Sequence, residues 1–175
     1  MKIKRIIAHL LNNLLNTIIH FNALAFNNDQ LHISLCAIKC MRVKFLGKKI
    51  RIGTYTYFIE PQNLTIGNNA FLNEFTRIAA YAPIEIGNDF MAAAYLSIDS
   101  GSHDLTDLTP KNEKIIIGSR VWCGTRVTIC AGSIIGDGAV IGSGSVVMRK
   151  FPIPAGWLAI GIPAKPIKLI NKNIL

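Results

Sequence analysis

Aliphatic residues recur every six positions along most of this 175-residue chain. Twelve six-residue segments share a template in which an aliphatic residue comes first and a small residue usually second. Eleven of the twelve begin with Ile, Leu or Ala, and seven have Gly in second place. A period of six fits neither an α-helix nor a two-sided strand. The segments start at Ile52, Ile66, Leu72, Ile78, Ile86, Ala92, Ile98, Ile117, Cys123, Ile129, Ile135 and Ile141.

This period predicts a short strand followed by a turn, repeated many times, with one aliphatic side chain of each strand pointing inward. Glycine in second place suits the corner, where the chain turns and a side chain would be crowded. Three such strands close a triangular coil, and stacked coils pair with one another around a continuous aliphatic core. We therefore predict an all-β solenoid, a parallel β-helix of about five coils over residues 50–151.

The period is interrupted at three places. Two aliphatic pairs, Leu64–Ile66 and Ile84–Ile86, are spaced by two residues instead of six, which indicates enlarged corners or restarts of the register. A longer gap separates Ile98 from Ile117 and contains a polar segment of eleven residues, 104–114. Because a polar segment of this length cannot enter the core, we predict that it forms a loop projecting from the solenoid.

The N-terminal region has a helical pattern in place of the six-residue period. Residues 1–26 begin with three basic residues, and polar residues then interrupt the apolar run, which is too short for the ~20 residues of a membrane span. No cleavage site of a signal peptide is evident. We predict an amphipathic helix that packs on the core or a neighbouring subunit, or that lies on an anionic membrane surface. Its aliphatic residues fall at helical spacing at Ile3, Ile6, Ile7, Leu10, Leu14 and Ile18.

The chain therefore divides into three regions. Residues 1–49 are assigned to the amphipathic helix and a lead-in strand, residues 50–151 to the β-helix with its loop, and residues 152–175 to a C-terminal tail. Lys and Arg outnumber Asp and Glu by 19 to 10, which favours an anionic partner such as a phosphorylated cofactor, nucleic acid or a membrane. The four cysteines match neither a zinc site nor a disulfide framework, which favours a cytoplasmic location, soluble or peripheral at the inner membrane.

The stretch VWCGTRVTICAGSIIGDGAVIGSGSVV, followed by GIPAKPIK, makes the assignment narrower. Together with the repeat it resembles the hexapeptide-repeat acyltransferases, in particular the galactoside, maltose and colanic-acid O-acetyltransferase branch. The resemblance covers about residues 50–168. It implies a left-handed β-helix, a homotrimer, acetyl-coenzyme A as co-substrate and no metal. The implied reaction transfers an acetyl group to a sugar hydroxyl, in surface polysaccharide or lipopolysaccharide biosynthesis, and no nucleic-acid partner is expected.

His103 is the one histidine within the repeat, and it stands at the base of the predicted loop. A neutral imidazole can accept the proton of a hydroxyl that attacks a thioester. The catalytic histidine of the resembled family lies on the same motif, thirty residues after an asparagine that binds the acceptor, and here that position is Asn73. The resemblance thus implies His103 as general base and Asn73 as acceptor-binding residue. Asp99, Asp104 or a backbone carbonyl are candidates for orienting the imidazole.

The resemblance also implies a coenzyme-binding set, with added amide contacts from the backbone of residues 131–132. Met148 stands where the family usually has a hydroxyl residue, so a contact there is expected through its backbone. Arg149 and Lys150 keep the positive charge that phosphate requires. Tyr81 replaces an acid of the galactoside enzymes, which favours a sugar on a lipid or a growing glycan as acceptor. The implied side chains are Trp122, Thr125, Ser143, Met148, Arg149, Lys165 and Lys168.

Four other functions were weighed against this one. A γ-type carbonic anhydrase needs three zinc-binding histidines, and His103 is alone in the repeat, so this class is excluded. Serine O-acetylation is less favoured because the N-terminal region is short for that family. N-acetylation of an amino sugar stays open, since His103 and Asn73 would serve an amine as well as a hydroxyl. A membrane-associated scaffold is the non-enzyme alternative, favoured by the basic N-terminus and opposed by the retained histidine.

Overall fold

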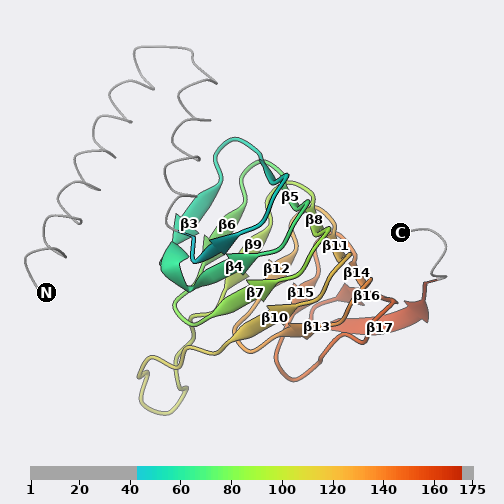
Figure 1. Cartoon of the computed structure of the whole chain (residues 1–175). Helices are drawn as coiled ribbons and strands as arrows, with labels where there is room; N and C mark the ends of the chain where they lie inside the picture. The colour runs from blue at the N-terminus through green and yellow to red at the C-terminus, as the bar shows by residue number, and fades with distance from the viewer. Residues whose placement is uncertain (1–42, 171–175) are drawn as a thin grey trace, which may run out of the picture.

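The computed structural model describes residues 43–170, so the helix predicted within residues 1–26 lies outside the described residues. The strands form three sheets, here called sheets A, B and C, which are the three sides of a solenoid (Figure 1). Each strand from β1 to β12 pairs in parallel with the strand three places later in the chain, and β14 pairs in parallel with β16. The prediction of an all-β parallel β-helix of about five coils is confirmed.

Each coil contributes one short strand to each sheet. Sheet A contains β1 (Phe45–Leu46), β4 (Leu64–Ile66), β7 (Ile84–Ile86), β10 (Ile115–Ile117) and β13 (Ile134–Ile135). Sheet B contains β2 (Arg51–Ile52), β5 (Phe71–Leu72), β8 (Met91–Ala92), β11 (Trp122–Cys123), β14 (Val140–Ile141), β16 (Trp157–Gly161) and β17 (Ala164–Leu169). Sheet C contains β3 (Tyr57–Ile59), β6 (Arg77–Ala79), β9 (Ser97–Asp99), β12 (Thr128–Ile129) and β15 (Val146–Val147). A 3-10 turn, η1 (Pro61–Asn63), precedes β4.

The strand register explains the irregular spacing in the sequence. Leu64 pairs with Ile84, which gives coils of 20 residues before the loop, whereas Ile117 pairs with Ile135, which gives 18 residues after it. The three-residue strands β4, β7 and β10 of sheet A bury both ends, as Leu64 and Ile66 show. Ile86 pairs with Ile117, so the intervening coil has 31 residues, eleven more than its predecessors. This excess equals the length of the predicted loop 104–114, which projects from the solenoid between β9 and β10 (Figure 1).

The core is filled by the residues that begin the six-residue segments. Eleven of the twelve are buried, and the exception, Ile52 on the first coil, is half-buried and packs against the others. The corners between sheets are narrow, and the chain passes several of them with positive φ angles. Burial of these aliphatic side chains thus fixes the register of every strand, because a shift by one residue would turn them toward solvent.

The corner between sheets B and C, here called corner BC, carries a ladder of aromatic rings. The Tyr55 and Phe75 ring centroids lie 4.9 Å apart, those of Phe75 and Tyr95 lie 4.8 Å apart, and both pairs are almost parallel. The guanidinium of Arg126 continues the ladder over Tyr95 at 5.2 Å. All four residues have positive φ angles, which are unfavourable for large side chains. Stacking along the ladder offsets part of this backbone cost.

The C-terminal strands change direction. β16 continues sheet B in parallel with β14, and β17 then folds back antiparallel on β16, with a register shift between Leu158 and Ala159. Nowhere in residues 43–170 is there a helix with the length and apolarity needed to cross a membrane.

Candidate active site

The loop that carries His103 is held as a short antiparallel ladder. The amide of Glu113 donates to the Ser100 carbonyl at 2.9 Å, and the amide of Lys111 donates to the Ser102 carbonyl at 2.7 Å. His103 faces Pro110 across the next rung, as an isolated β-bridge. The His103 side chain is exposed at this position. The loop therefore presents the imidazole to solvent from a backbone that is fixed on both sides.

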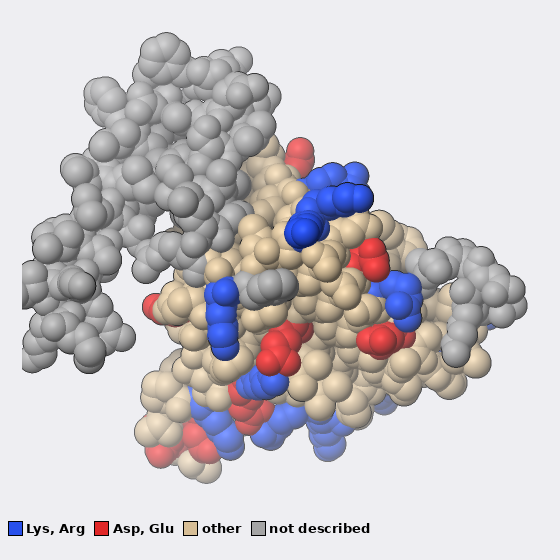
Figure 2. Space-filling model, in the orientation of Figure 1, with Lys and Arg blue, Asp and Glu red and all other residues tan. Residues whose placement is uncertain are grey.

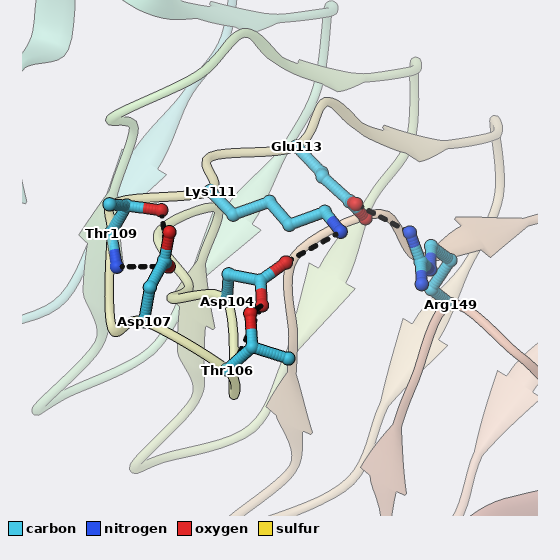
Figure 3. Close-up of polar contacts among 7 residues, drawn as sticks. All are labelled: Asp104, Thr106, Asp107, Thr109, Lys111, Glu113 and Arg149. Carbon is cyan, nitrogen blue, oxygen red and sulfur yellow. Dashed lines mark hydrogen bonds and ion pairs between the residues drawn. The ribbon is translucent and has the colours of Figure 1, made fainter.

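Two aspartates shape the tip of the loop. Asp104 accepts hydrogen bonds from the amide and hydroxyl of Thr106 at 2.9 and 2.6 Å, and Asp107 accepts the same pair from Thr109 at 3.0 and 2.7 Å (Figure 3). These are the turns that Asp followed by a hydroxyl residue favours. The Thr106 hydroxyl and amide lower the pKa of Asp104, and the Thr109 amide and hydroxyl lower that of Asp107.

Both carboxylates proposed to orient the imidazole have other partners. Asp99 accepts from Arg77 at 2.8 Å with one oxygen and from the Gly101 amide at 2.8 Å with the other. Asp104 binds Thr106 with one oxygen, and its second oxygen lies 3.5 Å from the ammonium of Lys111. Within the described residues neither carboxylate is bonded to His103. The backbone bridge to Pro110, rather than a carboxylate, holds this segment in place.

An ion pair fastens the returning arm of the loop to the fifth coil. Arg149 donates to a Glu113 carboxylate oxygen at 2.5 Å (Figure 3). Gly132 contacts both members of this pair and has a φ angle of +75°. A Cβ atom on Gly132 would overlap the Glu113 carboxylate. A side chain at position 132 would therefore displace the pair.

The implied site residues gather at two different corners of the solenoid. Asn73 follows β5 at corner BC, where Thr125 and Ser143 stand on later coils. His103 follows β9 at the corner between sheets C and A, here called corner CA, where residues 131–132 and 148–149 also lie. Sheet C separates the two corners with strands of two or three residues, or roughly 7–10 Å. A single chain therefore does not bring Asn73 and His103 onto one corner.

The implied residues at corner BC are anchored by turns. The Asn73 side chain is half-buried, and its amide oxygen accepts from the Glu74 amide at 2.8 Å. The Thr125 carbonyl accepts from the Gly144 amide at 2.8 Å. A Cβ atom on Gly124 would overlap the Ser143 hydroxyl, so the two coils approach closely here. The Thr125 and Ser143 side chains remain exposed to solvent.

The remaining implied coenzyme contacts lie on sheet B and on the C-terminal strand. Trp122 points outward from β11 and is 44% exposed, between Met91 and Val140 in register. Lys165 and Lys168 belong to β17 and are exposed, and the Lys165 ammonium lies 5.6 Å from the Phe151 ring centroid. The described residues thus offer exposed basic groups and an exposed aromatic ring, the groups that a phosphorylated adenosine would need.

Three contacts at corner CA were not predicted from the sequence. They are the Glu113–Arg149 pair, the Arg77–Asp99 pair, and the packing of the Tyr81 ring against Gly101, where a Cβ atom would lie 2.7 Å from the ring. The sequence offered one indication of the Glu113–Arg149 pair: Glu113 is the only acidic residue in residues 109–114, the arm by which the loop returns to the solenoid. The partners of these residues are distant in sequence, so spacing could not reveal them.

The two cysteines within the described residues are poor nucleophiles. Burial raises the pKa of Cys123 to about 12. Burial, and then the neighbouring charge of Asp99, raise the pKa of Cys130. Residues 43–170 contain no cluster of three or more His, Cys, Asp or Glu side chains that could hold a metal ion.

Comparisons with known proteins agree with this architecture, although no family model matches the chain. Galactoside O-acetyltransferase of Escherichia coli is 31% identical over 131 residues, which cover 72% of this chain and 64% of that protein. The E. coli acetyltransferase WbbJ, whose name assigns it to lipopolysaccharide biosynthesis, is 32% identical over 120 residues, which cover 59% of each chain. The chain thus spans about 60% of the length of these two relatives. The E. coli acetyltransferase WcaF, whose name assigns it to colanic acid biosynthesis, is 30% identical over 125 residues, which cover 70% of this chain and 68% of that protein.

Solved structures show the same fold. A maltose O-acetyltransferase from Clostridium difficile superposes with a TM-score of 0.76 at 29% identity, over 83% of this chain and 80% of that one. A galactoside acetyltransferase in complex with coenzyme A superposes with a TM-score of 0.69 at 29% identity, over 77% of this chain and 69% of that one. The predicted left-handed β-helix is thereby confirmed. On its repeat, its fold and these relatives, the chain belongs to the hexapeptide-repeat acetyltransferase family.

Proposed function

We propose that the protein is an acetyl-coenzyme A-dependent O-acetyltransferase that modifies a sugar hydroxyl in surface polysaccharide or lipopolysaccharide biosynthesis. The observation that carries this proposal is the exposed His103, held by a laddered loop on a hexapeptide-repeat scaffold. The names of the relatives, which include a galactoside and a maltose O-acetyltransferase, support the same chemistry. A cytoplasmic location, where acetyl-coenzyme A is made, fits this role.

His103 acts as the general base in this reaction. Its imidazole takes the proton of the acceptor hydroxyl while the oxygen attacks the thioester carbonyl, and the bond from carbon to sulfur then breaks to release the coenzyme thiolate. The proton held on the imidazole passes to that thiolate, which balances the reaction. A base of this kind typically accelerates a reaction ~10²–10⁴-fold. Asn73 holds the acceptor, because its side-chain amide can accept from one hydroxyl and donate to another.

The coenzyme is held by exposed groups of the later coils and the tail. Arg149, Lys165 and Lys168 supply charge for its phosphates, and Trp122 forms a wall of the groove. Thr125, Ser143 and the backbone at Met148 supply polar contacts along the coil. Exposure of all these side chains supports the assignment, since a bound phosphate must reach them.

A homotrimer supplies what one chain lacks. Packing three solenoids side by side lets corner CA of one subunit, with His103, face corner BC of the next, with Asn73. An outward column of apolar residues on sheet B supports such contact, because Phe71, Met91, Trp122 and Val140 are in register and Met91 and Trp122 are over 40% exposed. The site is then built at each of three equivalent interfaces.

Tyr81 bears on the choice of acceptor. Its ring packs against Gly101, beneath the segment that carries His103, and is 45% exposed. An aromatic ring at this position offers stacking to a sugar but no carboxylate for its hydroxyls. The acceptor class that fits is a sugar carried on a lipid or a growing glycan. N-acetylation of an amino sugar is the second candidate, since the same base and amide would serve an amine.

The experiment is an acetyl-transfer assay that follows release of the coenzyme thiol. Wild type and His103→Ala are compared with nucleotide-linked, lipid-linked and polymer-linked sugars, and the product is analysed for ester or amide linkage. Ester formation that depends on His103 supports the proposal. An amide product would select the second candidate, and absence of coenzyme A binding in a calorimetric titration of the wild type would contradict both. Sedimentation of a fully active monomer would contradict the trimer.

A further inference from the structure

The positive charge of this protein is concentrated at one end. Residues 1–59 contain nine Lys or Arg and a single acidic residue, Asp29, which gives a formal net charge of +8. Residues 60–175 contain ten basic and nine acidic residues, a net charge of +1. Nearly all of the formal charge of +9 therefore belongs to the first third of the chain. Such asymmetry indicates that this end meets an anionic partner.

The described part of this region forms the first coil of the solenoid, and its basic side chains have no acidic partner within residues 43–170, although Arg51 stacks over the Phe71 ring at 4.7 Å. Lys44, Lys48, Lys49 and Arg51 are all exposed, and none forms an ion pair with another described residue. The four ion pairs of residues 43–170 all lie on later coils and on the loop. Figure 2 shows Lys and Arg side chains grouped over the first coils, whereas basic and acidic side chains are mixed around the loop.

The first coil also offers room for an anionic group. Lys48 and Lys49, with Asn68 and Asn69 of the second coil, line an open hollow of about 470 Å³. The two asparagine side chains are held in place, because Asn68 accepts from the Lys48 amide and Asn69 donates to Asp89, both at 2.8 Å. The lysine ammonium groups remain available to a ligand at this edge. We call Lys44, Lys48, Lys49 and Arg51 the basic edge.

We infer that the basic edge is a docking surface for an anionic lipid bilayer. The N-terminal sequence of the chain favours lipid over nucleic acid, because residues 1–26 combine Lys2, Lys4 and Arg5 with six aliphatic residues at helical spacing. Basic residues beside an amphipathic apolar segment are typical of membrane-surface binding. A nucleic acid would use the cations alone, whereas a bilayer surface also accepts the aliphatic side chains.

Docking through the basic edge places the first coil against the bilayer and brings the candidate site near the lipid. His103 follows the third coil, and stacked strands are about 4.8 Å apart, so the base stands two coils or roughly 10 Å along the axis from the basic edge. A sugar attached to a membrane lipid would reach that distance. This step rests on the proposed acetyltransferase function, whereas the docking itself does not.

The test is cosedimentation of the full chain with vesicles of phosphatidylcholine alone or mixed with phosphatidylglycerol. We expect binding to the mixed vesicles only, weakened by salt. Replacing Lys44, Lys48 and Lys49 by Gln should weaken binding by one to two orders of magnitude, since each such residue contributes roughly fivefold. The matched control replaces Lys111, Lys114 and Arg120 by Gln, which removes the same charge from later coils and should change binding less than threefold.

Three results would overturn the inference. These are equal binding to neutral and anionic vesicles, equal loss of binding in the two triple variants, and tighter binding of the wild type to a DNA duplex than to the vesicles. The assay needs no acetyl transfer, so its failure is separate from failure of the proposed function. Coenzyme A titration of the same preparations reports on the latter.

Discussion

Glu113 and Arg149 are joined by an ion pair of 2.5 Å although they lie 36 residues apart in the chain. The pair connects the loop that carries His103 to the corner of the fifth coil. Arg149 is 63% exposed at its side chain and Glu113 only 24%, so the arginine is the partner that solvent or a ligand reaches. A phosphate that binds Arg149 would therefore compete with Glu113 and loosen the returning arm of the loop.

Glu113→Gln should increase the affinity for coenzyme A. The substitution removes the negative charge that competes with phosphate for Arg149, and exposed pairs of this kind are worth about 0–1 kcal/mol, or up to roughly fivefold in the dissociation constant. Isothermal titration with coenzyme A measures this. Glu85→Gln is the control, because it breaks the 2.8 Å pair with Lys114 on sheet A and should leave the affinity unchanged. Weaker binding by Glu113→Gln would show that the carboxylate assists the coenzyme.

His103→Ala should lower turnover by about two to four orders of magnitude, the range for losing a positioned general base. The side chain is exposed and fills no part of the core, so the thermal midpoint and the coenzyme affinity should stay close to those of the wild type. Steady-state kinetics, thermal unfolding and titration on one preparation give the three values. Unchanged turnover in a folded variant that binds coenzyme would remove His103 from the mechanism.

The aromatic ladder predicts that glycine at position 75 lowers the stability of the fold less than alanine does. Phe75→Ala removes two stacked pairs, worth about 0.5–1.5 kcal/mol each, and keeps a side chain at a φ angle of +59°. Phe75→Gly loses the same pairs but relieves the backbone strain, by about 1 kcal/mol. Urea unfolding should rank the wild type first, Gly second and Ala third. Leu105→Ala, at a side chain that is 93% exposed, should not differ from the wild type. Equal stability of all the variants would mean that the ladder contributes nothing.

The loop tip should lose its order in acid. Hydrogen bonds from Thr106 and Thr109 lower the pKa values of Asp104 and Asp107 from the ordinary value of an aspartate, since such bonds favour the ionised form. Since the folded pKa lies below the unfolded one, their stabilising effect is complete above the unfolded value and disappears as the pH falls through the folded value. The amide resonances of Thr106 and Thr109 should titrate with midpoints below that of an aspartate in an unfolded peptide of the same sequence. Asp104→Asn should abolish the Thr106 transition alone, and midpoints above the peptide value would contradict the hydrogen bonding described.

Cys123 should resist thiol reagents in the folded protein. Its pKa of about 12 leaves almost no thiolate at pH 8, and its side chain is fully buried. Mass spectrometry after maleimide treatment should find Cys123 labelled only when a denaturant is present. Rapid labelling under native conditions would mean that the fourth coil opens readily.

The scaffold was predictable from the sequence because each coil must bury its own aliphatic residues. Ile117 and Ile135, for example, mark the stacking of sheet A by their spacing alone. The length of the loop could also be predicted, from the gap that it leaves in the six-residue period. Its internal structure could not be predicted, since the hydrogen bond from Arg149 to Glu113 depends on the path by which the loop returns to the solenoid. The repeat also did not show that His103 and Asn73 occupy different corners, because the two-residue spacing Ile84–Ile86 shifts the phase between them.

The reversal of β17 has a consequence for the length of the molecule. Parallel coils present the same unpaired backbone groups at every level, so an open end is a template on which another solenoid could continue without limit. The strand that folds back on β16 runs in the wrong direction for such addition and shifts register as it does so. β17 therefore works against parallel extension of sheet B at this end of the solenoid. The change in direction favours a particle of defined size over a growing fibre.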